Sequence, residues 1–595
     1  MGMYRGSGDG ISVAAYTGDR AVLLAFDLAA DRVDGLAGFA VACTPPDTPR
    51  RAGPSGRAKD EYFLQNRLNF AKGVSAGTPF ESEQWTPSNK APFQTFHWTH
   101  YPSTGPGKYT YTVYAAYFAE RGGGGSGAVP SLRPLSGPMA SVDVDLRPVQ
   151  PGGPGGVEIG FTRSMVSSQA YTNRFKNKGL HPLPQTMDFD TAAYRDQYAW
   201  LGAHAREAIV AFLERCRADP KTTLDVFAFD FDEPDIIRTL CAMGDRVRVY
   251  QDNSDSHCSK KSPEQDMRGS AGKKDDPTPP REPDTVRALR KAGAAVRTGH
   301  FTGLSHNKVM VRRKEGVPEA VLCGSANFTV RGLYVQANSV LVFEEPAVAA
   351  LYAAAFDQAW DGPKEFKASQ IAAGWNHVEI GTARFAFSFA PHETAFPLDR
   401  IQEAIAGAKQ SVLFAMMQMT GSGTAMDAVK ALPDREDLYS MGIIQQKSQM
   451  KLFKPDTGVE NFTIASHAYL AKDVPAPFSA EVSGGFGQVI HHKMVICDFN
   501  GNDPVVFCGS SNLARGGETS NSDNLLAIHD RDAATTYAVE AIRLYDHFRF
   551  RSLREASTAA KPLVLQASSA WAEPYYNPGS IRYRERVALA GTAGE

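Results

Sequence analysis

The sequence lacks the features that would place the protein in a membrane or in a disulfide-stapled secreted scaffold. Its 595 residues include seven cysteines, an odd number, and no C-x-x-C pair, which argues against a disulfide framework or a zinc site. Several cysteines end apolar runs, as Cys323 and Cys508 do, so we expect small buried thiols in a reducing compartment. No apolar run approaches the length that spans a bilayer.

The sequence also lacks a charge bias and a recognisable targeting segment. The formal net charge is −2, with 43% hydrophobic and 22% charged residues, so any nucleic-acid or membrane contact must come from a local patch. The first residues, MGMYRGSGDG, contain no apolar signal-peptide stretch, and Gly6 departs from the myristoylation pattern. The expected location is therefore cytoplasmic.

The N-terminal part of the chain has the pattern of an all-β module. In the run KYTYTVYAAYF, residues Tyr109, Tyr111 and Val113 share one face at period two, as in a half-buried antiparallel strand. Further strands are predicted at 21–28, 36–43 and 140–146, with the glycine-rich run at 121–127 as a hairpin loop. The tyrosine-rich strand near the end of this module resembles an immunoglobulin or fibronectin type III sandwich, which would bind a partner or substrate.

A Pro/Gly-rich segment at 147–156 predicts a domain boundary, after which helical and apolar strand patterns alternate in α/β order. The polar stretch 258–284 is expected to be a solvated loop, with a substrate-facing lid as the alternative. The predicted organisation is a β-sandwich at 1–150, two α/β halves at 157–375 and 376–560, and a C-terminal tail at 561–595.

An internal repeat carries most of the functional information. The stretch that begins SHNKVMVRR recurs as the stretch that begins IHHKMVICD, and five polar or glycine positions repeat at the same offsets of 0, 2, 18, 19 and 21 residues. The first copy has His306, Lys308, Gly324, Ser325 and Asn327, and the second has His491, Lys493, Gly509, Ser510 and Asn512. A second similarity, VEIGFTR at 157 and VEIGTAR at 378, is expected near the start of each half.

The spacing of these residues indicates a shared site. Residues i and i+2 of a strand face the same side, so the histidine and lysine of each copy project together. An antiparallel return strand then delivers Gly-Ser-x-Asn beside them, where Gly allows close backbone approach and Ser and Asn supply neutral donors. Two imidazoles, two ammonium groups and two amides suit a phosphodiester, because one imidazole can attack phosphorus while the other protonates the leaving oxygen.

Both copies resemble the phospholipase D superfamily pattern, H-x-K-x4-D followed by G-S-x-N, over about residues 157 to 555. The resemblance implies a duplicated α/β fold with a pseudo-twofold active site and a covalent phosphohistidine mechanism without a metal or other cofactor. It further implies that His306 is the nucleophile and His491 the general acid. Because both half-sites lie on one chain, no dimer is required.

The two copies depart differently from the family pattern. The second has Asp498 at the motif acid position and Asp523 eleven residues after Asn512, where the family has an acid that supports a histidine. The first has Arg313 and Asn338 at these positions, and Arg313 is expected to be an exposed hairpin residue. We expect the carboxylate to raise the basicity of His491.

Other polar residues have simpler interpretations. The adjacent histidines 491 and 492 point to opposite faces of a strand and are not expected to bind a metal. Asp230 and Asp232 alternate at a strand end and either line the cleft or cap a helix.

The sequence therefore predicts a phosphodiesterase, with nucleic acid as the favoured substrate because basic turns flank the first motif and export signals are absent. A lipid-directed phospholipase D is the alternative. A scaffold with a decayed site is the non-enzymatic alternative, because the first motif is incomplete.

Overall fold

The computed structural model describes most of the chain. The described residues are 2–46, 60–78, 85–119, 129–153, 156–165, 168–182, 185–254, 256–257, 282–417, 419, 421–445, 463–466 and 489–590. The predicted loop at 121–127 and nearly all of the polar insertion at 258–284 lie outside these residues.

The N-terminal region is all-β, as predicted, and forms two antiparallel four-stranded sheets. One sheet has the order β1 (Met3–Gly8), β2 (Ile11–Gly18), β3 (Ala21–Leu28) and β8 (His97–His100). The other has the order β10 (Met139–Leu146), β9 (Gly107–Tyr117), β4 (Leu36–Thr44) and β5 (Tyr62–Phe63). Along β9 the side chains of Tyr109, Tyr111 and Val113 are buried and their neighbours are not, which confirms the period-two pattern. The Tyr109 hydroxyl donates to the carbonyl of Gly105, as in the tyrosine corner of sandwich domains.

The C-terminal segment completes the core of this sandwich. The 3₁₀ helix η10 (Ser569–Tyr575) buries Trp571 and Tyr575 among the sandwich residues. The Tyr575 ring lies 4.6 Å from that of Phe96, and the Trp571 indole donates to the carbonyl of Leu36 over 3.0 Å. Residues 561–595, predicted as a tail, thus contribute side chains to the N-terminal core.

Two larger mixed sheets follow, one in each half. The first has the order β11 (Val157–Phe161), β17 (Ser339–Phe343), β16 (Val317–Gly324), β15 (Val309–Lys314), β12 (Thr222–Ala228), β13 (Val247–Asp252) and β14 (Ala295–Gly299). The second has the order β18 (Asn376–Ile380), β19 (Ala383–Ala390), β25 (Asp523–His529), β24 (Val505–Gly509), β23 (Lys493–Cys497), β20 (Ser411–Met416), β21 (Tyr439–Ile444) and β22 (Thr463–Ser466).

The seven strands of the first sheet match seven strands of the second in order and direction, which fits a duplicated fold. The matching strands of the second sheet are, in order, β19, β25, β24, β23, β20, β21 and β22. The VEIG similarity does not follow this match. Val157 lies on β11, which pairs with β17, whereas Val378 lies on the additional edge strand β18. Both stretches lie near the start of their halves, as expected, but the strand equivalent to β11 is β19, so the two stretches are not structurally equivalent.

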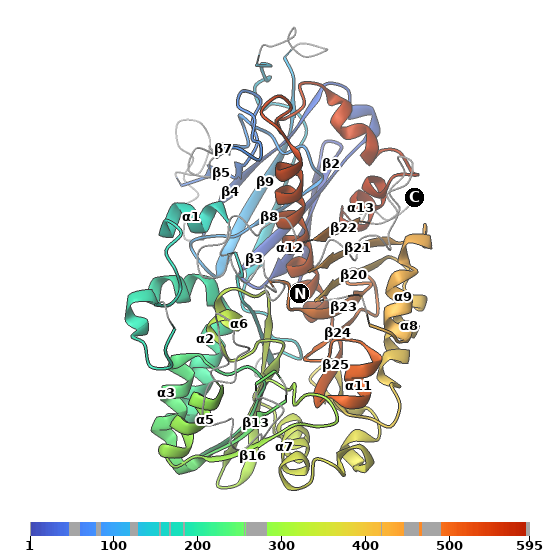
Figure 1. The fold of residues 1–595 in the computed structure, drawn as a ribbon. Helices are drawn as coiled ribbons and strands as arrows, with labels where there is room; N and C mark the ends of the chain where they lie inside the picture. The colour runs from blue at the N-terminus through green and yellow to red at the C-terminus, as the bar shows by residue number, and fades with distance from the viewer. Residues whose placement is uncertain are drawn as a thin grey trace.

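Helices cover the sheets (Figure 1). They are α1 (Gln169–Phe175), α2 (Arg195–Ala218), α3 (Pro234–Met243), α5 (Glu282–Lys291), α6 (Val330–Tyr334), α7 (Pro346–Asp361), α8 (Pro397–Gly407), α9 (Thr424–Lys430), α11 (Arg515–Ser520), α12 (Arg531–Ala556) and α13 (Ile581–Ala590). Within the described residues, no helix has the length and apolar character needed to cross a bilayer.

The long helix α12 joins the sandwich to the second half, since it contacts β2 of the sandwich as well as β21 and β22 (Figure 1). A Cβ at Gly18 would lie only 2.7 Å from Val539 Cγ1, so the glycine permits this close packing. The sandwich also meets the first half, where Asp19 accepts from the Phe161 amide over 2.9 Å. The N-terminal module is therefore packed against the α/β core.

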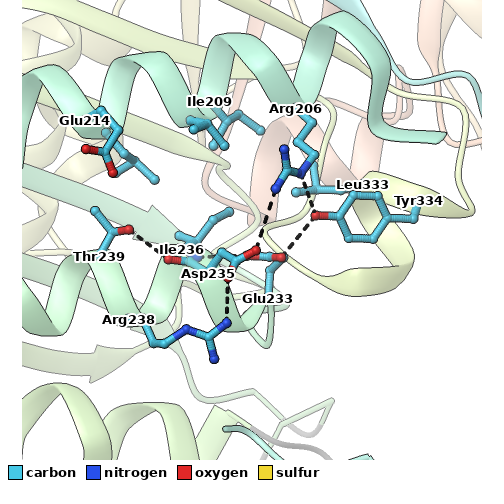
Figure 2. Close-up of a pocket in the computed structure, with 12 residues that line it drawn as sticks. Arg206, Ile209, Glu214, Glu233, Asp235, Ile236, Arg238, Thr239, Leu333 and Tyr334 are labelled. Carbon is cyan, nitrogen blue, oxygen red and sulfur yellow. Dashed lines mark hydrogen bonds and ion pairs between the residues drawn. The ribbon is translucent and has the colours of Figure 1, made fainter. Parts of the chain in front are cut away.

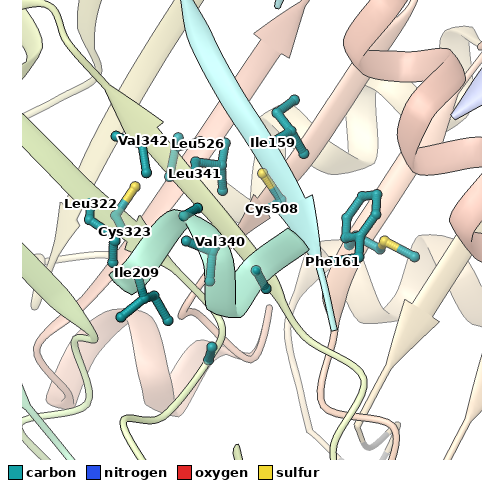
Figure 3. Close-up of a cluster of buried hydrophobic side chains, with 14 of the residues drawn as sticks. Ile159, Phe161, Ile209, Leu322, Cys323, Val340, Leu341, Val342, Cys508 and Leu526 are labelled. Carbon is teal, nitrogen blue, oxygen red and sulfur yellow. The ribbon is translucent and has the colours of Figure 1, made fainter. Parts of the chain in front are cut away.

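The two halves share one hydrophobic core (Figure 3). Cys323 and Leu341 from the first sheet are buried in the same cluster as Cys508 and Leu526 from the second. Burial raises the pKa of the Cys323 thiol to about 12 and does the same for Cys508, so both behave as small apolar side chains. Both thiols are buried, as expected. The shared core fixes the two sheets relative to each other.

Candidate active site

The first His-x-Lys lies immediately before β15, and the β15–β16 hairpin returns the chain to the same end of the sheet. Met310 pairs with Leu322, which brings Gly324 and Ser325 beside His306 and its lysine. The second copy is built in the same way, with β23 and β24 as the hairpin. The predicted local geometry is therefore present in both halves.

Two backbone bridges connect the halves at this point. Ser305 pairs with Ser522, and Ala337 pairs with Ile490, in symmetric parallel bridges. The His306 amide donates to the carbonyl of Ser522 over 2.8 Å, and the corresponding amide of His491 donates to the carbonyl of Ala337 over 3.2 Å. Each histidine is thus anchored to the opposite half, and the two clusters meet across the interface.

Each histidine ring is also held by a side chain of the opposite half, an arrangement that we call the crossed support. His306 Nδ1 lies 2.7 Å from Asp523 Oδ1, while His491 Nδ1 lies 2.8 Å from Asn338 Oδ1 and 3.1 Å from the carbonyl of Ser325. The expectation that Asp523 raises the basicity of His491 is therefore wrong, because the chain crossing places this carboxylate on the other ring. Carboxylate and carbonyl oxygens only accept, so Nδ1 carries the proton in both rings. Neither Nε2 has a hydrogen-bond partner among the described residues.

The serines of the two motifs hold these supports in place. Ser510 donates to Asp523 Oδ1 over 2.7 Å, and Ser325 donates to Asn338 Oδ1 over 2.9 Å. Both hydroxyls are buried, and each donates to the residue that holds a histidine. This agrees with a supporting role for the two serines.

Both histidines are disposed to be neutral at rest. Burial lowers the pKa of His306, and Lys308 lowers it further, while Asp523 acts in the opposite direction. Burial holds the pKa of His491 well below its usual value, and the repulsion from Lys493 and Lys308 adds to this effect. His491 is therefore the weaker base of the two.

The two lysines are buried beside the rings. Lys308 donates to the carbonyl of His306, and Lys493 donates to that of His491 over 2.8 Å. Burial lowers the pKa of Lys308 to about 8, although Asp523 and nearby acids of the first half oppose this. The pKa of Lys493 is held well below its usual range by burial and by the charge of Lys308. An anion bound between these groups would stabilise their charged forms.

The motif asparagines complete the cluster. Asn327 Nδ2 donates to Asp230, which leaves a second N–H for a ligand. Asn512 makes no side-chain hydrogen bond to a described residue, and its Oδ1 is buried without a partner. Amide and ammonium groups from both halves are thus available to nonbridging phosphate oxygens.

The motif acid position has a structural role in both halves, remote from the histidines. Asp498 lies just beyond the far end of β23 and accepts from the backbone amides of Lys409, Gln410 and Ser411 over 2.7 to 3.1 Å. The described geometry gives this residue no contact with His491.

Arg313 occupies the equivalent position in the first half and is not an exposed hairpin residue. Its side chain is only 14% exposed and lies 2.6 Å from Asp225 and 2.8 Å from Asp357. Arg248 contacts the same two acids over 2.7 and 2.8 Å. The first half thus has an arginine at the motif position, and this arginine pairs with an acid, Asp225, on the neighbouring strand β12.

Several residues near the site were not assigned by sequence reasoning. His257 lies between Asp230 and Asp252, with Glu282 3.9 Å from its Nε2. Asp230, His257 and Glu282 are the described group whose ligand atoms lie close enough together to suit a metal ion, within 4.8 Å. Both nitrogens of His257 already have hydrogen-bond partners, Asp252 and Asp230. The alternation at 230–232 was the only signal for this group. Asp230 contacts Asn327, whereas Asp232 accepts from the amide of Val330 at the start of α6.

A separate cavity of about 280 Å³ lies between α2, α3 and α6 (Figure 2). Glu233 lies at its wall, accepts from the Tyr334 hydroxyl over 3.0 Å and has a pKa raised by burial to about 7. Arg206 contacts the same hydroxyl over 3.2 Å. None of the predicted site residues lines this cavity.

Comparisons with known proteins bear on the two halves. The family model described as "Cardiolipin synthase, PLD-like domain" matches residues 213–360 and 401–545, and each range holds one His-x-Lys and one Gly-Ser-x-Asn. No curated protein matches the sequence.

Solved structures show only distant similarity. The phospholipase D family member Nuc from Salmonella typhimurium is 21% identical and covers 25% of this chain and 86% of its own, with a TM-score of 0.19. Phosphatidylserine synthase from Haemophilus influenzae is 10% identical, covering 64% of this chain and 92% of its own, with a TM-score of 0.35. Polyphosphate kinase from Porphyromonas gingivalis is 12% identical with a TM-score of 0.38, and the match covers 64% of this chain but only 54% of the kinase.

The two matched ranges contain both halves of the crossed cluster and all strands of the two sheets except β11, β18 and β19. The chain belongs to the phospholipase D superfamily, whose members are generally phosphodiesterases.

Proposed function

We propose that the protein cleaves phosphodiesters through a covalent phosphohistidine, with His306 as the nucleophile and His491 as the general acid. The observation that carries this proposal is the crossed support, in which Asp523 holds His306 and Asn338 holds His491. The two rings are chemically different although their surroundings are nearly symmetric.

In the first step, Nε2 of His306 attacks phosphorus and the bond to the leaving oxygen breaks. The Nε2 proton of His491 passes to that oxygen, so the leaving group departs as an alcohol. Lys308, Lys493 and the motif asparagines hold the nonbridging oxygens, whose charge is stabilised in this buried site.

In the second step, water attacks the phosphorus of phosphohistidine 306. His491, now neutral, accepts the proton of that water, and the bond between phosphorus and His306 breaks. The products are a phosphomonoester and the original protonation state of both rings. A primary alcohol in place of water would give transfer instead of hydrolysis.

The assignment of roles follows from the two supports. Phosphohistidine carries positive charge, and the Asp523 carboxylate stabilises it 2.7 Å from Nδ1. His491 has only neutral acceptors, so its protonated form is a strong acid. It becomes protonated when the phosphodiester anion enters and offsets the charges of Lys308 and Lys493.

A nucleic acid is the favoured substrate. Of the large hydrophobic side chains that are exposed among the described residues, Val317 alone lies on an element that positions the site, at the end of β16 opposite Gly324. These exposed side chains are Tyr62, Trp85, Tyr101, Val129, Met139, Val317, Leu553 and Val564. A lipid substrate calls for an apolar rim beside the site, and the described residues do not show one.

A phospholipid headgroup is the second candidate, because the matching family model is described by a lipid-synthesising activity. Hydrolysis and transfer use the same covalent intermediate, so the catalytic cluster is compatible with either substrate. The two substrates differ outside the phosphate: a nucleic acid needs a basic surface beside the site, and a phospholipid needs an apolar one.

The discriminating experiment is a panel of purified protein against single-stranded DNA, duplex DNA, RNA and phosphatidylcholine vesicles, with and without EDTA. We expect cleavage of a nucleic acid that weakens as salt is raised and is unchanged by EDTA. Lys308→Met is the control for contaminating activity and should be inactive. Cleavage of the vesicles alone would favour the lipid candidate, whereas inactivity on every phosphodiester would contradict the proposed function.

A further inference from the structure

A chain of hydrogen bonds in the first half connects the side-chain amide of Asn327 to the segment that carries His306, immediately before β15. Asn327 Nδ2 donates to Asp230 Oδ2, and Asp230 Oδ1 lies 2.9 Å from His257 Nε2. On the other side of the ring, His257 Nδ1 lies 2.8 Å from Asp252 Oδ2, and Asp252 Oδ1 accepts from the amide of Ser305 over 2.6 Å. One imidazole thus links the residue before His306 to a motif asparagine.

The contacts of His257 specify its charge. Both of its nitrogens face carboxylates, which only accept, so both carry a proton and the ring is an imidazolium. Burial disfavours that charge, but Glu282, Asp230 and Asp252 outweigh burial and raise the pKa of His257 well above its usual value. Burial in turn would raise the pKa of Asp230, yet the His257 contact lowers it, with Lys308 and Arg331 as further cations facing this carboxylate.

Asp230 is the member of this chain that a substrate would meet. Its side chain is 39% exposed, whereas His257 is buried. A carboxylate beside the Asn327 amide would repel a phosphodiester if its charge were not offset. The imidazolium therefore both orients Asp230 and neutralises it.

The second half uses a neutral residue at the corresponding place. Phe227 pairs with Tyr250 in the first sheet as Ala415 pairs with Ile443 in the second, so Gln445 is the counterpart of Asp252. Gln445 Oε1 accepts from the amide of Ile490 over 2.8 Å, the contact equivalent to that of Asp252 with Ser305. The backbone contact is common to both halves, and the acid is specific to the first.

We propose that His257 is a positioning residue with two roles. Through Asp230 it holds Asn327, and through Asp252 it holds the segment that carries the nucleophile. Its positive charge also offsets that of Asp230, so that this carboxylate does not repel the substrate phosphate. The inference rests on the proposed function of the same site. It predicts that replacing His257 weakens substrate binding because the Asp230 carboxylate then lacks a counter-ion.

The kinetic test uses two variants and a matched control. His257→Gln should raise KM by about tenfold or more, because the Asp230 carboxylate then faces the phosphate without its counter-ion. Adding Asp230→Asn should bring KM back to within about threefold of wild type, since the residual charge is removed. His377→Gln, on the exposed face of the edge strand β18, should behave as wild type.

A role in structure alone would not be rescued by Asp230→Asn, so failure of the rescue would overturn the proposal. Nitrogen-detected NMR of the imidazoles gives a readout that needs no substrate: the His257 ring should show two protonated nitrogens at pH 8. A single protonated nitrogen, or Zn²⁺ binding that His257→Gln abolishes, would also overturn it. If the protein cleaves no phosphodiester, the proposed function fails while the NMR experiment still decides the charge of His257.

Discussion

The two α/β halves have matching strands and matching motifs, yet they differ in charge at equivalent positions. The first half contributes Asn338 to a histidine where the second contributes Asp523. The far end of the motif hairpin carries Arg313 in one half and Asp498 in the other. A duplicated scaffold thus keeps its backbone contacts while its side chains give the two histidines different acid strengths.

The crossing of the chain explains why this difference matters. Because each support reaches the histidine of the opposite half, the acid of the second half serves the nucleophile of the first. The two partners therefore suit the two proposed roles. His306, which must carry phosphate, has a carboxylate that stabilises its positive charge, whereas His491, which must release a proton, has only neutral acceptors.

Removing the charge difference between the supports should have the largest effect. Asp523→Asn keeps an acceptor for His306 Nδ1 but gives both rings the amide partner that His491 has in wild type. We expect kcat to fall by about 10² to 10⁴, as when the carboxylate behind a catalytic imidazole is replaced by an amide. Steady-state kinetics on the best substrate of the panel checks this.

The matched control changes the other support. Asn338→Asp should lower kcat much less than Asp523→Asn, and it should shift the pH dependence by raising the pKa of His491. If the two substitutions have equal effects, or if Asn338→Asp is the more damaging one, the assignment of roles is reversed.

The lysines predict a pH dependence of intermediate size. The pKa of Lys308 is about 8, so its ammonium form is present below that pH and is lost as the pH rises through it. We expect kcat/KM to fall as the pH rises through the neutral range, because the free enzyme must gain a proton at His491. The fall should become steeper above pH 8, where Lys308 also loses its proton. A profile that stays flat to pH 10 would contradict the view that the charged Lys308 binds phosphate.

The motif acid positions predict effects on stability and not on chemistry. Arg313→Ala leaves the buried Asp225 with Arg248 as its remaining partner and should cost about 1–3 kcal/mol. Asp498→Ala exposes backbone amides that water can reach and should cost about 1 kcal/mol. Chemical denaturation measures both, and kcat should remain within about twofold of wild type.

The more severe substitution at the same position is Arg313→Asp, which restores the family residue. It places a third carboxylate beside Asp225 and Asp357, so it should destabilise the protein more than Arg313→Ala. A stabilised Arg313→Asp protein would show that the network around Asp225 is not what holds the arginine.

The sequence was sufficient for the architecture and for the reacting groups. Period-two burial along β9 and the alternation of helices and strands after residue 157 are local patterns, and they predicted the sandwich and the α/β halves. The offsets from His306 to Asn327 and from His491 to Asn512 predicted two clusters, since a hairpin must return them to the same edge.

Long-range pairings could not be predicted in this way. Spacing along the chain associated Asp523 with His491, but the bridge between Ser305 and Ser522 brings it to His306. Nothing in the pattern around Arg313 pointed to Asp225, 88 residues away. The repeat did not point to His257, because the neutral Gln445 stands in the second half where Asp252 stands in the first.

The most direct test of the account is covalent trapping with the His491→Ala protein. Without the ring that activates water, a substrate with a good leaving group should leave phosphate on the enzyme, and peptide mapping by mass spectrometry should locate it at His306. Wild type should show little steady-state label, and His306→Ala should show none. A label at any other residue, or turnover by His306→Ala, would contradict the assignment of His306 as the nucleophile.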